Sequence, residues 1–149
     1  MEIANIETFV KLLQLSVIPV VLISGVGLLL LSFTNRIART IDRSRALVKE
    51  IRSIPDNERS KADEQLEILI RRSEYLRAAI TFTALSILFA SLMIIGLFLL
   101  LFLKWPTEHI VLIFFFVSVL SIIGSMGLFL MDIFLTLRAL KLEAGMIEQ

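Results

Sequence analysis

The chain of 149 residues contains no cysteine and a single histidine, His109. The absence of cysteine excludes disulfides, thiolate catalysis and cysteine-ligated metal sites. One histidine excludes a site built on a histidine pair and argues against a Ser-His-Asp triad, since catalysis needs several such groups brought together. We therefore expect no enzyme and no catalytic, cofactor-binding or metal-binding residues.

Ionisable side chains are also missing from three long blocks, at residues 12–35, 78–103 and 110–131. Hydrophobic residues make up 57% of the chain and charged residues 19%, whereas a soluble domain has about 25% charged residues. A helix of about 20 apolar residues crosses roughly 30 Å of hydrocarbon. The blocks exclude soluble and disordered classes, and they predict one all-α membrane domain over residues 1–149. Its spans are expected at about 12–34, 79–103 and 110–132.

The middle of each block lacks a carboxylate, which argues against an ion-coupled pump or antiporter. Basic residues are instead concentrated in one connection, because eleven of the fifteen Lys and Arg lie from Arg36 to Arg77. Lys11 and Lys104 are the two on the other side of the spans. Since basic loops stay in the cytoplasm, we expect the N-terminus outside and the connection and C-terminus inside. The segment before the first block lacks a basic n-region, so no cleavable signal peptide is expected.

The connection over residues 36–77 has the pattern of an antiparallel helical hairpin. Residues on both arms recur at spacings of three and four, which is the seam of a coiled coil. The seam comprises Ile37, Ile41, Ser44, Val48, Ile51 and Pro55 on the first arm and Ala62, Leu66, Leu69, Ser73, Leu76 and Ile80 on the second. In opposite directions the arms align with Ile37 opposite Ile80. With a turn at residues 53–58, where a proline ends the first arm, this predicts helices over about 12–53 and 60–103, and a third helix that continues into a short cytoplasmic tail.

Charged residues gather where the blocks meet the hairpin. The candidates for ion pairs or for membrane-surface contacts are Arg36, Arg39, Arg43, Arg77, Glu74 and Asp132. Three of the arginines share one helix face and are expected to attract anionic lipid headgroups; ion pairs between helices or subunits and an anion-handling vestibule are the alternatives. The register places Arg43 opposite Glu74. Because an unpaired Asp132 among apolar neighbours would be costly, we predict that it pairs with Arg36 or Arg77.

Small and polar residues mark the faces of the spans. Pro19, Gly25 and Gly27 in the first block form either a packing notch or a gating hinge, since proline frees a backbone carbonyl and glycine permits close approach. The second and third blocks carry Thr83, Ser86, Ser118, Ser121 and Ser125. These hydroxyl residues either pack the helices together or line a water path between subunits.

Several motifs together resemble a family of small bacterial membrane proteins catalogued as a domain of unknown function. They are the stretch Ile18–Gly25, the run Leu28–Leu31, the pair Asn35-Arg36, the stretch Asp42–Leu47 and the pair Arg71-Arg72. The resemblance implies three membrane helices and a bacterial source, and hence the inner membrane. It supplies no catalytic residues.

Two hypotheses about function follow. In the first, the protein forms a homo-oligomer with a pore on its symmetry axis, because three helices are too few to enclose a pathway alone. In the second, it is a membrane-anchored scaffold or regulatory subunit whose cytoplasmic hairpin binds a partner protein. The expected partners are the lipid bilayer, further copies of the chain and an unidentified protein, but no nucleic acid.

Overall fold

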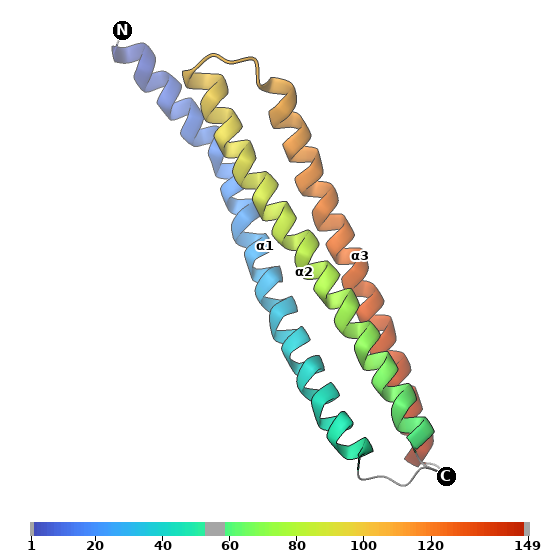
Figure 1. Cartoon of the computed structure of the whole chain (residues 1–149). Coiled ribbons are helices and arrows are strands. Elements are labelled where there is room, and N and C mark those ends of the chain that lie inside the picture. Colours follow the sequence, from blue (N-terminus) through green and yellow to red (C-terminus); the bar gives the residue numbers. More distant parts are fainter. Residues whose placement is uncertain (1, 53–58, 148–149) are drawn as a thin grey trace. The chain divides into compact units, whose positions relative to one another are not determined.

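The structure, a computed structural model, describes residues 2–52 and 59–147, and this part of the chain is helical apart from the short connection at residues 103–107 and the turn at residue 52. Helix α1 covers Glu2–Ile51, α2 covers Arg59–Phe102 and α3 covers Glu108–Ile147 (Figure 1). All three are long and apolar enough to cross a membrane, which confirms the three apolar helices that the blocks predict. Helix α1 begins ten residues earlier than predicted, and the predicted turn at 53–58 lies outside the described residues.

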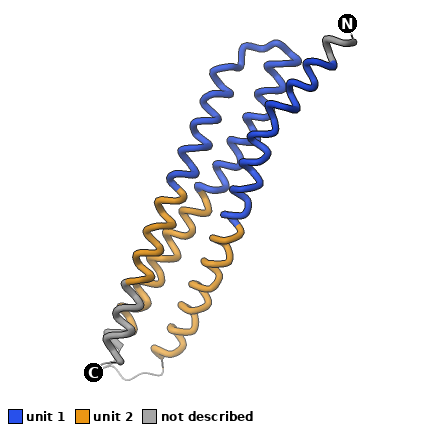
Figure 2. Tube along the Cα trace, turned by 180° about the vertical axis from the view of Figure 1, so that it is seen from behind, with its two compact units in different colours: residues 1–30, 82–124 blue, residues 31–81, 125–149 orange. Residues whose placement is uncertain are grey.

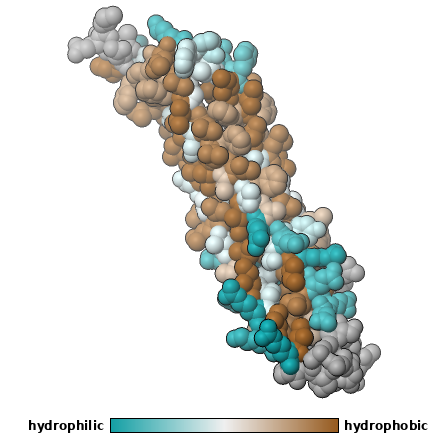
Figure 3. Space-filling view, in the orientation of Figure 1, coloured by the Kyte–Doolittle hydropathy of each residue, from teal (hydrophilic) through white to brown (hydrophobic). Residues whose placement is uncertain are grey.

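The chain divides into two compact units, and each helix contributes a segment to both. Unit 1 comprises Met1–Leu30 and Phe82–Gly124, and unit 2 comprises Leu31–Thr81 and Ser125–Gln149 (Figure 2). In the face seen in Figure 3, hydrophobic side chains cover most of unit 1, while hydrophilic side chains gather over unit 2. This contrast agrees with the sequence, since the charged hairpin lies in unit 2 and all three uncharged blocks lie mostly in unit 1.

In unit 1, α2 and α3 are antiparallel and pack closely through small residues. A Cβ atom added to Gly96 would lie 2.8 Å from a methyl carbon of Val111, so the Val111 side chain would have to shift to admit alanine. The connection is equally tight, since Thr107 donates from Oγ1 to the carbonyl of Gly96 at 3.2 Å. Lys104 adopts a left-handed φ of 54° just after α2 ends. Small residues therefore set the approach of the two helices, as expected where lipid provides no hydrophobic drive between them.

In unit 2, α3 contacts both other helices. The rings of Phe33 on α1 and Phe129 on α3 have centroids 4.8 Å apart, and Phe33 is almost fully buried. On the other side, Ser125 donates from Oγ to the backbone carbonyl of Ala79 on α2 at 2.9 Å. Leu76 and Ala79 are completely buried. This core positions the charged side chains at the hydrophilic end of the spans.

The first arm of the hairpin buries a different stripe from the predicted seam. Thr40 and Leu47 are buried at 5% exposure each, whereas Val48 is 36% exposed. Ile41 is only half-buried. The predicted seam is thus displaced by one residue at Ile41 and Val48, whereas its members Ile37, Ser44 and Ile51 are half-buried. This displacement has a physical cause. Leu47 and Val48 are adjacent apolar residues about 100° apart on the helix, and an apolar pattern alone does not say which of them faces the neighbouring helix.

The predicted register of the two arms, which places Arg36 next to Thr81, stays a prediction. In the structure, Arg36 on the first arm and Arg72 on the second contact the same carboxylate. A pattern that repeats every seven residues looks the same after a slide of one heptad, so it predicts the face of a helix and leaves its axial position open.

Candidate functional site

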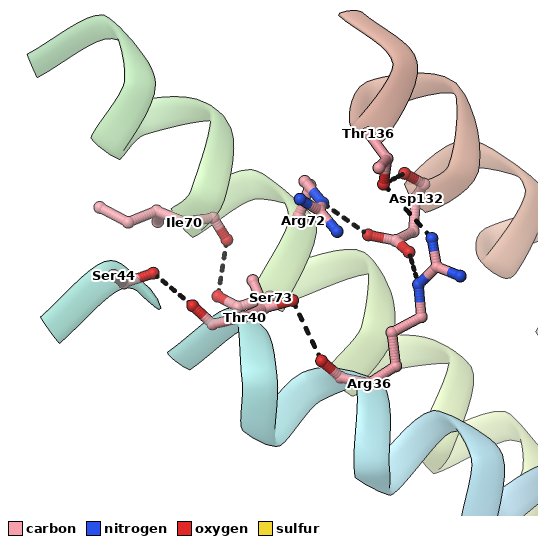
Figure 4. Close-up of polar contacts among 8 residues, drawn as sticks. All are labelled: Arg36, Thr40, Ser44, Ile70, Arg72, Ser73, Asp132 and Thr136. Carbon is pink, nitrogen blue, oxygen red and sulfur yellow. Dashed lines mark hydrogen bonds and ion pairs between the residues drawn. The ribbon is translucent and has the colours of Figure 1, made fainter. Parts of the chain in front are cut away.

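The candidate site is a charged cluster in unit 2 centred on Asp132 of α3. The Asp132 side chain is completely buried, and arginines from both other helices contact it (Figure 4). Nε of Arg36 on α1 lies 2.6 Å from Oδ2, and Nε of Arg72 on α2 donates to Oδ1 at 3.1 Å. The arginine side chains are 30% and 14% exposed. One carboxylate therefore joins the three helices.

Further contacts fix the orientation of Arg36. Its terminal nitrogen donates to Oγ1 of Thr136 at 3.3 Å, and that hydroxyl donates to the backbone carbonyl of Asp132 at 2.8 Å. Its guanidinium also lies 5.2 Å from the centre of the Phe129 ring, within the range of a cation–π contact. Arg36 is thus held by a carboxylate, a hydroxyl and an aromatic face.

The cluster carries more positive than negative charge. Two guanidinium groups share a single carboxylate, so one positive charge is left over. The contact of Arg36 Nε with Asp132 Oδ2 is an ion pair without an aligned hydrogen bond, and neither atom has another hydrogen-bond partner. A buried carboxylate is costly unless it is paired, so the contacts with both arginines compensate for the burial of Asp132.

The sequence positions the cluster through a seven-residue repeat shared by α2 and α3. Ser86 contacts Ser118, with the two hydroxyls 3.1 Å apart. Seven residues earlier on α2 and seven later on α3, Ala79 accepts from Ser125. One further step of seven on each helix leads to the pair formed by Arg72 and Asp132. Sequence reasoning missed Arg72 as a partner, although extending the small-residue stripe of the second block by one heptad would have found it.

The other predicted charged residues lie outside the contacts of Asp132. Arg36 is the predicted partner that the structure brings to Asp132, whereas Arg77 is exposed and makes no contact with it. Arg39 and Arg43 are exposed on the same helix as Arg36. Glu74 is exposed as well, and its predicted pairing with Arg43 stays a prediction.

The hydroxyl residues of the spans face the interior of the protomer. All five predicted residues, Thr83, Ser86, Ser118, Ser121 and Ser125, are buried. Ser118 also donates to the backbone carbonyl of Ser86 at 3.0 Å, and Ser121 donates within its own helix to Val117 at 2.8 Å. In each unit, these groups serve helix packing and are turned away from the outer surface.

The three residues of the candidate hinge lie on different sides of α1. Pro19 is buried, and the helix continues through it. A Cβ atom added to Gly25 or Gly27 would meet no atom within 4 Å. These two glycines therefore do not form a packing notch against another helix of this chain in its described part. A hinge at this point stays a prediction.

Fold and cluster together define a class, that of helical multi-pass membrane proteins with a buried ion cluster joining three helices. Among the described residues, no group of three or more histidine, cysteine, aspartate or glutamate side chains lies close enough to hold a metal ion. A family profile described as "Protein of unknown function (DUF2721)" matches residues 16–142. The chain therefore belongs to this family. Comparisons with curated proteins and with solved structures found no match.

Proposed function

We propose that this protein is a membrane-anchored scaffold or regulatory subunit of the bacterial inner membrane. In this proposal, the N-terminus faces outward, and the hairpin of residues 36–77 binds a partner protein in the cytoplasm. The single observation that carries the proposal is the inward orientation of the hydroxyl residues of the spans, which removes the polar lining that a pore between subunits would use.

The outward faces of the spans support this interpretation. Large apolar side chains dominate the exposed surface of unit 1, such as Leu28 at 70%, Leu120 at 63% and Ile123 at 61% exposure. An axial pore between copies would be lined by outward-facing residues, and apolar constrictions in pores tend to lose their water. Such a surface suits contact with lipid or with the helices of a partner.

The buried cluster supports a role for the hairpin. Asp132 ties Arg36 at the start of the first arm and Arg72 on the second arm to α3. Both arms are therefore braced at their base, and a braced element loses less conformational entropy when it binds a partner. Exposed apolar residues on the arms, such as Val48 and Ile70, provide surface for that contact.

The alternative is the homo-oligomeric pore. The observation in its favour is the open surface at Gly25 and Gly27, where no atom of the chain lies within 4 Å of an added Cβ. Small residues on a membrane helix allow a second helix to approach closely, and that helix would belong to another copy of the chain.

Two measurements separate these functions. The full-length protein is reconstituted into liposomes, and ion flux is recorded under salt gradients and applied voltage. In parallel, a photo-crosslinking residue is introduced into the protein in intact cells. It replaces Val48 on the hairpin or, as a matched control on the apolar outer surface of unit 1, Ile123. The proposal predicts no flux above that of empty liposomes, and it predicts heteromeric adducts from position 48 with none from position 123. Ion flux, together with adducts whose masses are multiples of the protomer, would overturn the scaffold in favour of the pore.

A further inference from the structure

A pocket of about 370 Å³ lies beside the charged cluster in unit 2. It is lined by Ser32, Arg36, Arg39, Thr40, Arg43, Leu69 and Arg72. Four of these seven residues are arginines, and no carboxylate lines the pocket. Its volume falls within the range of small-molecule binding sites, about 300–1,000 Å³.

The buried carboxylate organises two of the four arginines. Asp132 contacts Nε of both Arg36 and Arg72, and this shared contact leaves the pair with an excess positive charge. Because the two guanidinium groups are held by buried contacts, their positions are set before any ligand arrives. Preorganised groups of this kind lose little entropy on binding.

The other lining residues add donors. Arg39 uses Nε to donate to the backbone carbonyl of Asn35 at 3.4 Å, and its terminal nitrogens make no hydrogen bond to any described residue. The hydroxyl of Ser32 likewise has no hydrogen-bond partner in the described part of the chain. The pocket thus presents guanidinium and hydroxyl donors, with Leu69 as an apolar wall.

We propose that this pocket binds a phosphate-bearing anion. Guanidinium groups match the oxygens of phosphate in a two-pronged geometry and are favoured over ammonium groups for this purpose. Among anions, phosphate makes the fullest use of the site, because it accepts several hydrogen bonds from different directions. The proposal goes beyond the scaffold function and does not require a protein partner on the hairpin.

The position of the pocket along the chain indicates two sources for this phosphate. Arg36 follows directly on the first uncharged block, and Asp132 directly follows the third. In a bilayer these residues lie at the level of the headgroups, where basic pockets between membrane helices bind anionic lipids. A soluble phosphate compound from the cytoplasm has the same recognition chemistry, so the experiment includes an arm for each source.

The test compares two double variants that remove equal charge. Arg39→Gln with Arg43→Gln removes two exposed arginines from the pocket and leaves both partners of Asp132 in place. Arg71→Gln with Arg77→Gln is the matched control, because both residues are exposed and neither lines this pocket. Full-length protein is placed in nanodiscs of phosphatidylcholine alone or with added phosphatidylglycerol. Native mass spectrometry then measures the lipid that stays bound.

The expected result follows from about a fivefold change in affinity for each basic residue near an anionic group. The pocket variant should bind phosphatidylglycerol about 25-fold more weakly, whereas the control should keep the wild-type affinity. In the second arm, inorganic phosphate is added at constant ionic strength to protein in phosphatidylcholine nanodiscs, and the thermal unfolding midpoint is recorded. A rise in the wild type that the pocket variant lacks identifies a soluble phosphate as the ligand, and selective lipid loss identifies the headgroup.

Two results would overturn the proposal. One is equal weakening of both double variants, which means diffuse attraction to the membrane surface instead of a site. The other is wild-type binding of both anions by the pocket variant. Arg39→Lys serves as a second variant if the double variant does not fold, because it retains the charge but loses the planar fork. It should still bind phosphatidylglycerol measurably more weakly than wild type, and unchanged binding would also contradict the site.

Discussion

Asp132 is the residue on which unit 2 depends most. Its carboxylate is completely buried and contacts two arginines from different helices. Replacing it by asparagine keeps the shape of the side chain but leaves both arginines without a counter-charge. Breaking a buried pair by removing one partner costs about 3–5 kcal/mol.

We therefore predict that Asp132→Asn lowers the thermal unfolding midpoint in detergent by roughly 6–12 °C, taking about 3 kcal/mol and 2–4 °C per kcal/mol. Circular dichroism at rising temperature measures this change. Asp42→Asn is the matched control, because Asp42 is exposed on α1 and its replacement should shift the midpoint little. Equal midpoints for Asp132→Asn and the wild type would mean that the ion pairs contribute nothing to stability.

Ser118 tests whether the hydroxyl residues serve packing. It is buried in unit 1, donates to the carbonyl of Ser86 and lies 3.1 Å from the hydroxyl of that residue. We predict that Ser118→Ala lowers the free energy of unfolding by about 1 kcal/mol, a typical value for a hydrogen bond between membrane helices. Titration with sodium dodecyl sulfate measures it.

Ser24→Ala is the control for that prediction. Ser24 is exposed, and its hydroxyl bonds only within its own helix, to Val20. The control should therefore keep the wild-type stability. If Ser118→Ala had no effect on stability but changed ion flux, the hydroxyl would belong to a conduction path and not to the packed interior.

At the scale of the elements, burial on α1 follows a strict seven-residue repeat. Pro19, Val26, Phe33, Thr40 and Leu47 are buried in turn. A seven-residue repeat is typical of helices that pack along a left-handed seam. Only a narrow stripe of α1 is thus covered by its own chain, and its remaining faces are open to lipid or to a partner.

Glycines on two helices give opposite predictions. A Cβ at Gly96 would lie 2.8 Å from Val111, a β-branched residue with a stiff side chain. We predict that Gly96→Ala costs about 1–3 kcal/mol through overpacking, measured by the same detergent titration. The additional change Val111→Ala should recover part of this loss, because it removes the methyl group that clashes.

Gly25→Ala is the matched substitution at an open position, where no atom lies within 4 Å. It should leave the stability of the protomer unchanged or slightly higher, because alanine favours the helix. Comparable destabilisation by Gly25→Ala and Gly96→Ala would contradict the described packing. A selective loss of self-association in Gly25→Ala would instead assign this face to a contact between copies.

The sequence predicted the helices well because their causes are local. Uncharged blocks longer than a bilayer is thick fix the existence of the three helices, and the predicted bounds of α2 differ from the observed ones by one residue. The pairing of Asp132 with Arg36 was predictable from the sequence. An unpaired carboxylate among apolar neighbours would be costly, and both residues lie at the same predicted membrane boundary. The seam of the first arm was misplaced because adjacent apolar residues fit the pattern almost equally well.

The register of the arms was not predictable in the same way. A heptad pattern repeats along a helix, so a slide of about seven residues preserves every apolar match. Only contacts between distant residues remove such an ambiguity, as the contact of Arg72 with Asp132 does for α2 and α3. The pocket was not predictable from the sequence for the same reason, because its lining residues come from two helices, α1 and α2.

At the scale of the whole molecule, three apolar helices are combined with a region of charged side chains. The outward surface of unit 1 is apolar and the polar groups of its spans are internal, whereas unit 2 carries the arginine cluster and its pocket. Asp132 holds the arginines from α1 and α2 in one cluster. The proposed scaffold function and the proposed anion binding both rely on this cluster.

A double-mutant cycle between Asp132→Asn and Arg72→Gln tests this cluster most directly. The free energy of unfolding of the wild type, both single variants and the double variant is measured by detergent titration in the full-length protein. We predict a coupling energy of at least about 1 kcal/mol, because Arg72 has already lost its partner in Asp132→Asn, so that its replacement costs little more. Strictly additive effects of the two substitutions would contradict it.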